Sequence, residues 1–339
     1  MNKYIVTILF FISTSIAQSL TVDECVRIAL ENKPSLKRAE QDVTIARLNR
    51  ASTGALMLPS VNASNSFSET TYGNSSSEAS ERYSGGVSLS QSLFNFGTKI
   101  NTLKQSDNTY NTAKQQKRQA KARIILDVHT FYYQYLKNSE LFDIAGKDLE
   151  LSKKQLDLVQ NQYNLGAVSK TDFLKASVRY GTAKSSFLSR ELSKKNSEKS
   201  LRFSMGLLNS DIPIIIEQKM DLILTVPTFE EAYSLMLSNS PDLSILDNQI
   251  AGAQINVKKA WSSSLPSINM SIGMNASSAD QITRTYFDDN YIKSANITVS
   301  IPIFSGFRNR NSIQISKLQL DQAETRLRGG TNSAKVSLY

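Results

Sequence analysis

The chain of 339 residues is poor in the side chains that usually carry chemistry, with one cysteine, one histidine and one tryptophan. A single cysteine, Cys25, cannot form a disulfide within the chain, and it excludes metal sites built from several cysteines. The only histidine, His129, lies in a helical tract beside aromatic residues, which favours packing or solvation over catalysis. We therefore expect no enzyme, with no catalytic residues, no metal site and no cofactor.

Long hydrophobic runs are also missing beyond the N-terminus. Residues 1–17 combine a positive start, an apolar run and small residues at Ser15 and Ala17, which is typical of a signal peptide cut before Gln18. No later run approaches the roughly 20 apolar residues of a membrane-spanning helix. Cys25 lies too far inside the chain to be a lipidated first residue. These features predict an exported protein without transmembrane helices.

Charge of one sign is not concentrated anywhere, although the formal net charge is +9. The lysines and arginines are spread along helical tracts beside Glu, Asp and Gln. This pattern favours solvated helix faces over a nucleic-acid surface, and an exported protein meets little nucleic acid. We expect no nucleic-acid partner.

An internal repeat organises the sequence. Residues 21–62 align without gaps on 228–269, and the register resumes where Leu93-Phe94 matches Ile303-Phe304. Each copy begins with a threonine followed three residues later by glutamate, which predicts an N-terminal capping box. A helix is then expected to about residue 55 in the first copy and 262 in the second. Pro59 and Pro266 should end these helices and open extended segments.

The extended segments alternate with period two, which predicts a sheet with one apolar and one polar face. The clearest segments are 268–276 and 295–303, and the first copy repeats the pattern within 61–67 and 83–93. Polar loops are expected between the paired strands, at 70–82 and 278–290. A soluble sandwich shows the same alternation. Export, aromatic residues near the strand ends and an almost uncharged polar face favour a transmembrane barrel. Four strands are too few to close a barrel, so several chains must contribute.

A long helical hairpin follows the first pair of strands. Residues 98–163 contain no proline and one internal glycine, Gly146, and apolar residues recur at helical spacing. A return arm is expected at 171–206. At 1.5 Å per residue the first arm is roughly 100 Å long. The two shorter helices could stack end to end beside it as a tall helical wall.

These motifs together resemble the TolC-like outer-membrane efflux family. The residues that carry the resemblance are "TVDECVRIALENKPSLK" and "TFEEAYSLMLSNSPDLS", "LPSVN" and "LPSIN", "VSLSQSLFNFG" and "VSIPIFSGF", and "NQYNLGAVSKTDFLKA". The resemblance implies a mainly α fold with a transmembrane β part, in which four strands per chain form a twelve-stranded outer-membrane barrel in a homotrimer. It implies a periplasmic α-barrel that continues this barrel as an exit duct for efflux or type I secretion, docked to a periplasmic adaptor and an inner-membrane transporter.

The resemblance also assigns roles to the break between the hairpin arms. The family's adaptor-docking tip matches Leu165, Gly166, Ala167, Val168 and Ser169. A Thr-Asp pair that helps to close the periplasmic gate matches Thr171 and Asp172. Two simpler interpretations stay open, because the glycine could serve only a helix-hairpin turn, and Thr171-Asp172 could simply cap the returning helix.

The expected domain organisation departs from the family's pattern at its end. The domains expected for this chain are a signal peptide at 1–17 and a first repeat at 18–227, which contains the hairpin at 98–206 and a linker at 207–227. An incomplete second repeat follows at 228–339. We expect residues 228–339 to stop short of the family's second hairpin, which carries the partners of the gate latch. Paired glycines, Gly329 and Gly330, also stand where a long helix should run.

Several alternatives follow for the function. The chain could be a fragment of an efflux duct, a defective product or a protein that needs a second piece. A trimeric outer-membrane stalk with a structural or adhesive role and a soluble periplasmic adaptor are further alternatives. The alternation of strands and hairpin in two copies favours the duct.

Overall fold

A computed structural model describes residues 20–71, 80–207, 227–279 and 281–338. The predicted signal peptide and most of the predicted linker lie outside these residues. The described residues form two compact units, one from the described parts of 1–38 and 119–225 and the other from the described parts of 39–118 and 226–339. They do not follow the sequence repeats, and the predicted division into repeats stays a prediction.

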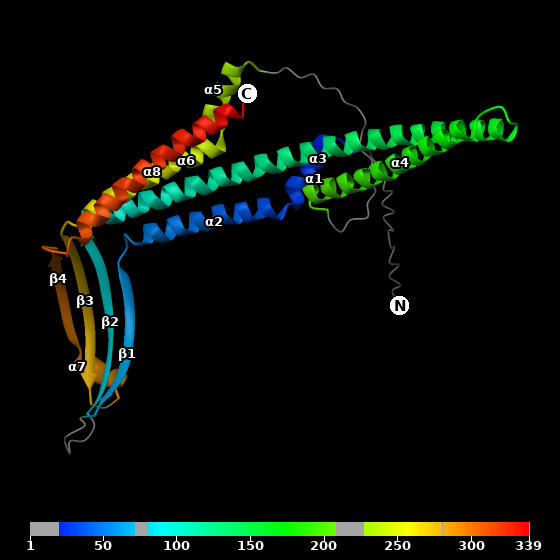
Figure 1. Cartoon of the computed structure of the whole chain (residues 1–339). Coiled ribbons are helices and arrows are strands. Elements are labelled where there is room, and N and C mark those ends of the chain that lie inside the picture. The colour runs from blue at the N-terminus through cyan, green and yellow to red at the C-terminus, as the bar shows by residue number, and fades with distance from the viewer. Residues whose placement is uncertain (1–19, 72–79, 208–226, 280, 339) are drawn as a thin grey trace, which may run out of the picture. The chain divides into compact units, whose positions relative to one another are not determined.

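The hairpin arms are two long helices, α3 (Thr98–Asn164) and α4 (Lys170–Met205) (Figure 1). The predicted arms, 98–163 and 171–206, are confirmed to within a residue. In the first unit the arms meet through Phe142 and Phe187, whose ring centroids are 5.0 Å apart. The internal glycine of α3, Gly146, faces the same Phe187 ring. Helical periodicity therefore placed both arms correctly.

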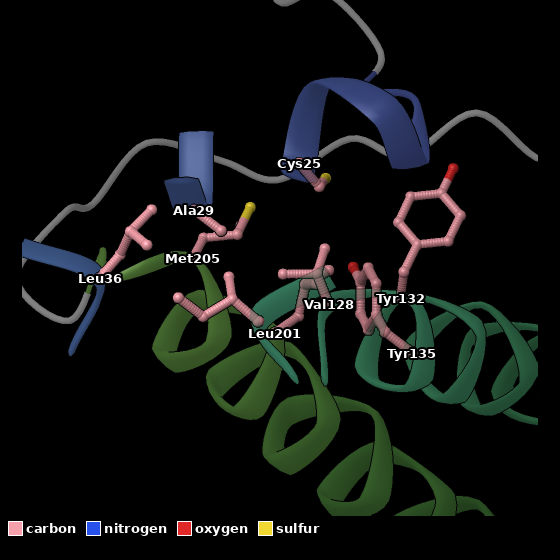
Figure 2. Close-up of a cluster of buried hydrophobic side chains, with 9 residues drawn as sticks. Cys25, Ala29, Leu36, Val128, Tyr132, Tyr135, Leu201 and Met205 are labelled. Carbon is pink, nitrogen blue, oxygen red and sulfur yellow. The ribbon is translucent and has the colours of Figure 1, made fainter. Parts of the chain in front are cut away.

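A short helix, α1 (Val22–Asn32), packs on the C-terminal part of α4 and closes the core of the first unit. Figure 2 shows Cys25 and Ala29 of α1 above Val128 of α3 and Leu201 and Met205 of α4, and all five are buried. The Cys25 thiol is completely enclosed, and burial raises its pKa to about 11. This cysteine is a packing residue of the core.

Proline divides the helix that was expected to run from residue 21 to 55. The structure has α1 and a separate helix α2 (Pro34–Ala55), and the second copy likewise has α5 (Phe229–Asn239) and α6 (Pro241–Ser262). A proline lacks the N–H that would continue the helical hydrogen bonds, and it disfavours a helical residue before it. Lys33 accordingly adopts an extended conformation. The expectation of one continuous helix was wrong at this point.

The predicted capping boxes are confirmed in both copies. The Thr21 N–H donates to Glu24 Oε2 at 2.9 Å, and the Glu24 N–H donates to Thr21 Oγ1 at 3.3 Å. Thr228 and Glu231 repeat this reciprocal pair at 2.9 and 3.4 Å. The pair satisfies two helix-end donors, which fixes where each helix begins.

Four antiparallel strands form one sheet in the order β1-β2-β3-β4 (Figure 1). They are β1 (Ser60–Thr70), β2 (Ser80–Phe94), β3 (Ser267–Ser278) and β4 (Ile292–Ser300). The register sets Val61 opposite Leu89, and Leu89 opposite Ile272. Serines pair with serines on the other face, as Ser60 does with Ser90. The prediction of one apolar and one polar face is confirmed.

Two details of the predicted strands and loops were wrong. Strand β4 ends at Ser300, so Ile301 and Ile303 lie beyond it, because Pro302 cannot donate to a strand ladder. The loop expected at 278–290 contains a short helix, α7 (Arg284–Asn290), in a stretch that has neither glycine nor proline. No helix among the residues described here is long and apolar enough to cross a membrane.

The last helix, α8 (Arg308–Val336), continues through both glycines that were expected to disturb it. It packs along α6 in the second unit. A Cβ atom at Gly330 would lie 2.5 Å from Leu246 Cδ1 of α6, whereas one at Gly329 would meet open space. Contact with α6 thus offsets the low helix propensity of this pair, and Gly330 allows a close approach.

Candidate functional site

The tip of the hairpin is a tight connection whose backbone hydrogen bonds are made locally. Helix α3 ends at Asn164, and Gly166 follows with φ +72°, a left-handed conformation that favours glycine. The Ala167 N–H donates to the Gln162 carbonyl at 2.8 Å, and the Gly166 N–H donates to the Tyr163 carbonyl at 2.9 Å. These two bonds form a Schellman motif, which satisfies carbonyl groups at the end of α3.

Helix α4 begins with a side-chain cap from Ser169. The Asp172 N–H donates to Ser169 Oγ at 3.2 Å, and the Ser169 hydroxyl donates to Asp172 Oδ2 at 2.7 Å. The side-chain hydrogen bond from Ser169 lowers the pKa of the Asp172 carboxyl, and the positive charge of Lys175 lowers it further. Asp172 is therefore held as an anion at the positive end of the α4 dipole.

The tip exposes an apolar side chain together with backbone. Leu165 is 84% exposed, and the space around Gly166 is open. Just below them, the rings of Tyr163 and Phe173 stack with centroids 5.5 Å apart and join the two arms. The tip thus presents an exposed leucine and accessible backbone on a firm aromatic base, an arrangement suited to binding a partner.

The structure brings all seven candidate residues into this one turn, with Leu165 to Ser169 in the connection and Thr171 and Asp172 in the first turn of α4. The glycine serves the hairpin turn, as the simpler interpretation required. The cap belongs to Ser169 together with Asp172, and Thr171 is exposed. Sequence reasoning missed the capping role of Ser169, although a serine three residues before an aspartate is a recognisable signal. The docking and latch roles stay predictions.

Each arm of the hairpin has apolar residues that pack on the other arm, and it also carries a second apolar stripe on another face. Among the described residues, no helix of this chain covers this second stripe. On α3 the stripe repeats every seven residues as Ile144, Leu151 and Leu158, each more than half exposed, and Leu165 continues this spacing into the connection. On α4 the residues Leu174, Val178, Leu188 and Leu192, each at least half exposed, follow steps of four, ten and four. A seven-residue apolar repeat is the pattern of coiled-coil packing.

A family model described as "Outer membrane efflux protein" matches residues 25–207 and 232–335. The chain belongs to this family. Membership places the chain among outer-membrane efflux proteins, as the sequence predicted.

Individual relatives of the outer membrane efflux protein family are distant in sequence. Probable outer membrane lipoprotein SilC of Salmonella typhimurium is 21% identical over 302 residues, covering 89% of this chain and 65% of that protein. Alkaline protease secretion protein AprF of Pseudomonas aeruginosa is 24% identical over 298 residues, covering 82% of this chain and 60% of that protein. The chain thus spans less than two thirds of the length of either relative.

Solved channel structures share the fold. The structure of CusC superposes with a TM-score of 0.81 at 19% identity, covering 93% of this chain and 73% of that chain. The Campylobacter jejuni CmeC outer membrane channel gives 0.79 at 19% identity, covering 94% and 70%. The fold is therefore that of TolC-like channels, mainly helical with four antiparallel strands.

Proposed function

We propose that this chain builds the wall of an outer-membrane exit duct for efflux or type I secretion. The observation that carries the proposal is the sheet, in which every paired strand contributes apolar side chains to one face and Ser, Asn, Thr and Gly to the other. A barrel in a membrane needs this division, because one face contacts lipid and the other contacts a water-filled lumen.

The duct requires several copies of the chain. In the described residues β1 pairs only with β2, and β4 pairs only with β3, so each edge strand has an unused side. Four strands cannot enclose a lumen, whereas three copies supply twelve. We propose a homotrimer in which β1 of one copy pairs with β4 of the next.

The second apolar stripes support the same assembly in the helical part. A helix with one seam toward its hairpin partner and another left exposed can pack between two neighbours, and repetition of this arrangement gives a closed helical wall. We propose that the stripes on α3 and α4 contact neighbouring helices in a periplasmic α-barrel.

The tip is proposed as the docking point for a periplasmic adaptor, which connects the duct to an inner-membrane transporter. Leu165 and the exposed backbone around Gly166 would form the contact, with Ala167, Val168 and Ser169 shaping the turn. Thr171 and Asp172 are proposed as this chain's part of the gate latch. The cargo is left open, since relatives carry names as different as cation efflux and alkaline protease secretion.

Deletion of the gene tests the duct itself. We expect increased sensitivity to at least one toxic compound or loss of a secreted protein, and restoration by the full chain in the outer-membrane fraction. Unchanged sensitivity and secretion across a broad panel would contradict the proposal. A chain that salt washes from the membrane would instead be a peripheral adaptor.

Substitution at Gly166 tests the tip. Gly166→Trp should abolish capture of the adaptor encoded with the pump while leaving trimers in the outer membrane. Gly166→Ala is the matched control, because it carries the same backbone strain at φ +72° without the bulk. Equal loss in both variants, or loss of trimers, would assign the glycine a folding role.

A further inference from the structure

A groove on the second unit combines the single tryptophan of the chain with two basic side chains. It lies between the end of α6 and the start of α8 and has a volume of about 600 Å³. We call it the Trp261 groove, and it is lined by Trp261, Ser264, Arg310, Ile313, Gln314 and Lys317. The ammonium group of Lys317 lies 5.9 Å from the centroid of the Trp261 ring, within cation–π range.

The charges in the groove are uncompensated. Neither Arg310 nor Lys317 forms an ion pair with a carboxylate in the described part of the chain. The first turn of α8 contains no acidic residue, although acidic residues are the ones that a helix N-terminus favours. Arginine in this turn adds to the positive end of the helix dipole. The local potential therefore attracts an anion.

The hydroxyl of Ser264 provides an independent observation. Its oxygen is buried, yet it has no hydrogen-bond partner among the described residues. A buried hydroxyl without a partner is costly, and a ligand that accepts a hydrogen bond would remove this cost. Ser264 and the two cations line the same groove, so the groove offers hydrogen-bond donors together with an apolar wall of indole and isoleucine.

The groove lies on the opposite side of α8 from a polar hollow. That hollow is lined largely by amides of α3, α6 and α8, among them Gln105, Asn108, Asn248, Gln319 and Gln322. Three residues of the hollow lie nine positions after three residues of the groove: Gln319 after Arg310, Gln322 after Ile313, and Arg326 after Lys317. Nine residues at about 100° each amount to two and a half turns, so the two sets face opposite directions. Because its lining is polar, we place the amide hollow toward the water of the proposed duct, and the Trp261 groove then faces outward.

The groove lies at the junction between the helices and the strands, because α6 ends at Ser262 and β3 begins at Ser267. In the proposed duct this junction lies at the surface of the membrane. Tryptophan is enriched at such membrane boundaries. The first repeat has Gly54, Ile100 and Asp107 at the matching positions, and its Asp107 is paired with Arg50. The combination of indole and free cations is thus confined to the second copy.

We propose that the Trp261 groove binds the headgroup of an anionic phospholipid of the inner leaflet, with the phosphate on Arg310, Lys317 and Ser264 and an acyl chain on Trp261 and Ile313. This inference rests on the proposed outer-membrane duct. Each basic residue near an anionic lipid surface contributes about a fivefold preference, so the two give about 30-fold.

Trp261 is the only tryptophan, so its fluorescence reports on this groove alone. The purified full chain in neutral detergent is titrated with short-chain phosphatidylglycerol, short-chain phosphatidylcholine and inorganic phosphate. We expect a saturable emission change with phosphatidylglycerol at about 30-fold lower concentration than with phosphatidylcholine, and no change with phosphate. Equal affinity for the two lipids would overturn the proposal, and a saturable response to phosphate would show a free-anion site instead.

The double variant Arg310→Gln/Lys317→Gln should lose the preference, whereas Arg326→Gln on the opposite face of α8 should keep it. A preference that survives the double variant would refute the assignment. Vesicle flotation separates the two proposals. A chain that does not float with vesicles contradicts the membrane duct, whereas a chain that floats but shows no lipid preference contradicts the Trp261 groove alone.

Discussion

Two neighbouring glycines in β2 should respond in opposite ways to the same substitution. A Cβ atom at Gly86 would lie 2.7 Å from the Met274 carbonyl oxygen and 2.9 Å from Asn275 Cβ. At Gly85 the nearest atom would be Asn65 Oδ1 at 3.7 Å, an ordinary contact. The carbonyl of Met274 belongs to β3, which is paired on both sides, so it cannot move away freely.

The expected magnitudes follow from these contacts. Gly86→Ala introduces a contact with backbone that real Cβ atoms do not make, and overpacking of this kind costs about 1–3 kcal/mol per chain. Gly85→Ala adds no clash, and it restricts the unfolded chain, which favours folding by about 0.5–1 kcal/mol. The two variants should therefore differ by at least about 1.5 kcal/mol, which is about tenfold in the folding equilibrium.

The assay is urea denaturation of the purified full chain in detergent, followed by circular dichroism. The fraction of folded oligomer in outer-membrane extracts, run on gels without boiling, provides a second measurement. Gly86→Ala should lower the urea midpoint and the oligomer fraction, and Gly85→Ala should leave both equal to or above those of the unmodified chain. Equal behaviour of the two variants would refute the close approach of β2 and β3 at Gly86.

Three further predictions concern the hairpin unit. Gly146→Ala should stabilise α3 by about 1 kcal/mol, since the added Cβ lies 3.6 Å from the Phe187 ring, and a lowered thermal midpoint would contradict this packing. Gly206→Ala should destabilise the unit by about 1–2 kcal/mol, because φ at this position is +77° and the added Cβ would lie 3.1 Å from the Asn32 carbonyl oxygen. An unchanged midpoint of urea denaturation would argue against this contact. The hydrogen bond from Ser169 lowers the pKa of the Asp172 carboxyl. The stabilisation of the α4 cap by this hydrogen bond is therefore present above the ordinary aspartate pKa of about 3.9, and it is lost as the pH falls through the lowered pKa. Amide exchange in the first turn of α4 should therefore be faster in Asp172→Asn than in the unmodified chain at neutral pH, and a difference that persists unchanged at pH 2 would contradict the mechanism.

The features that were predicted correctly depend on residues close together in the sequence. The capping boxes at Thr21 and Thr228 need only a glutamate three residues away, and the hairpin arms follow from apolar spacing along a tract without proline. The turn at Gly166 is also local, because its hydrogen bonds reach back no more than five residues. Such elements are visible in a single sequence, since backbone geometry converts spacing directly into structure.

The sequence by itself therefore determined the order of the strands and the hairpin arms, the two faces of the sheet and the place of the tip, whereas it missed the division of α1 from α2 and the helix α7. The tertiary structure decided the strand register that sets Gly86 against Met274, the packing of Gly330 on Leu246 that accompanies a continuous α8, and the meeting of Trp261 with Arg310 and Lys317. These contacts join residues that are far apart along the chain, and their energy depends on shape and burial in three dimensions. A side chain's type and its neighbours in sequence do not specify them.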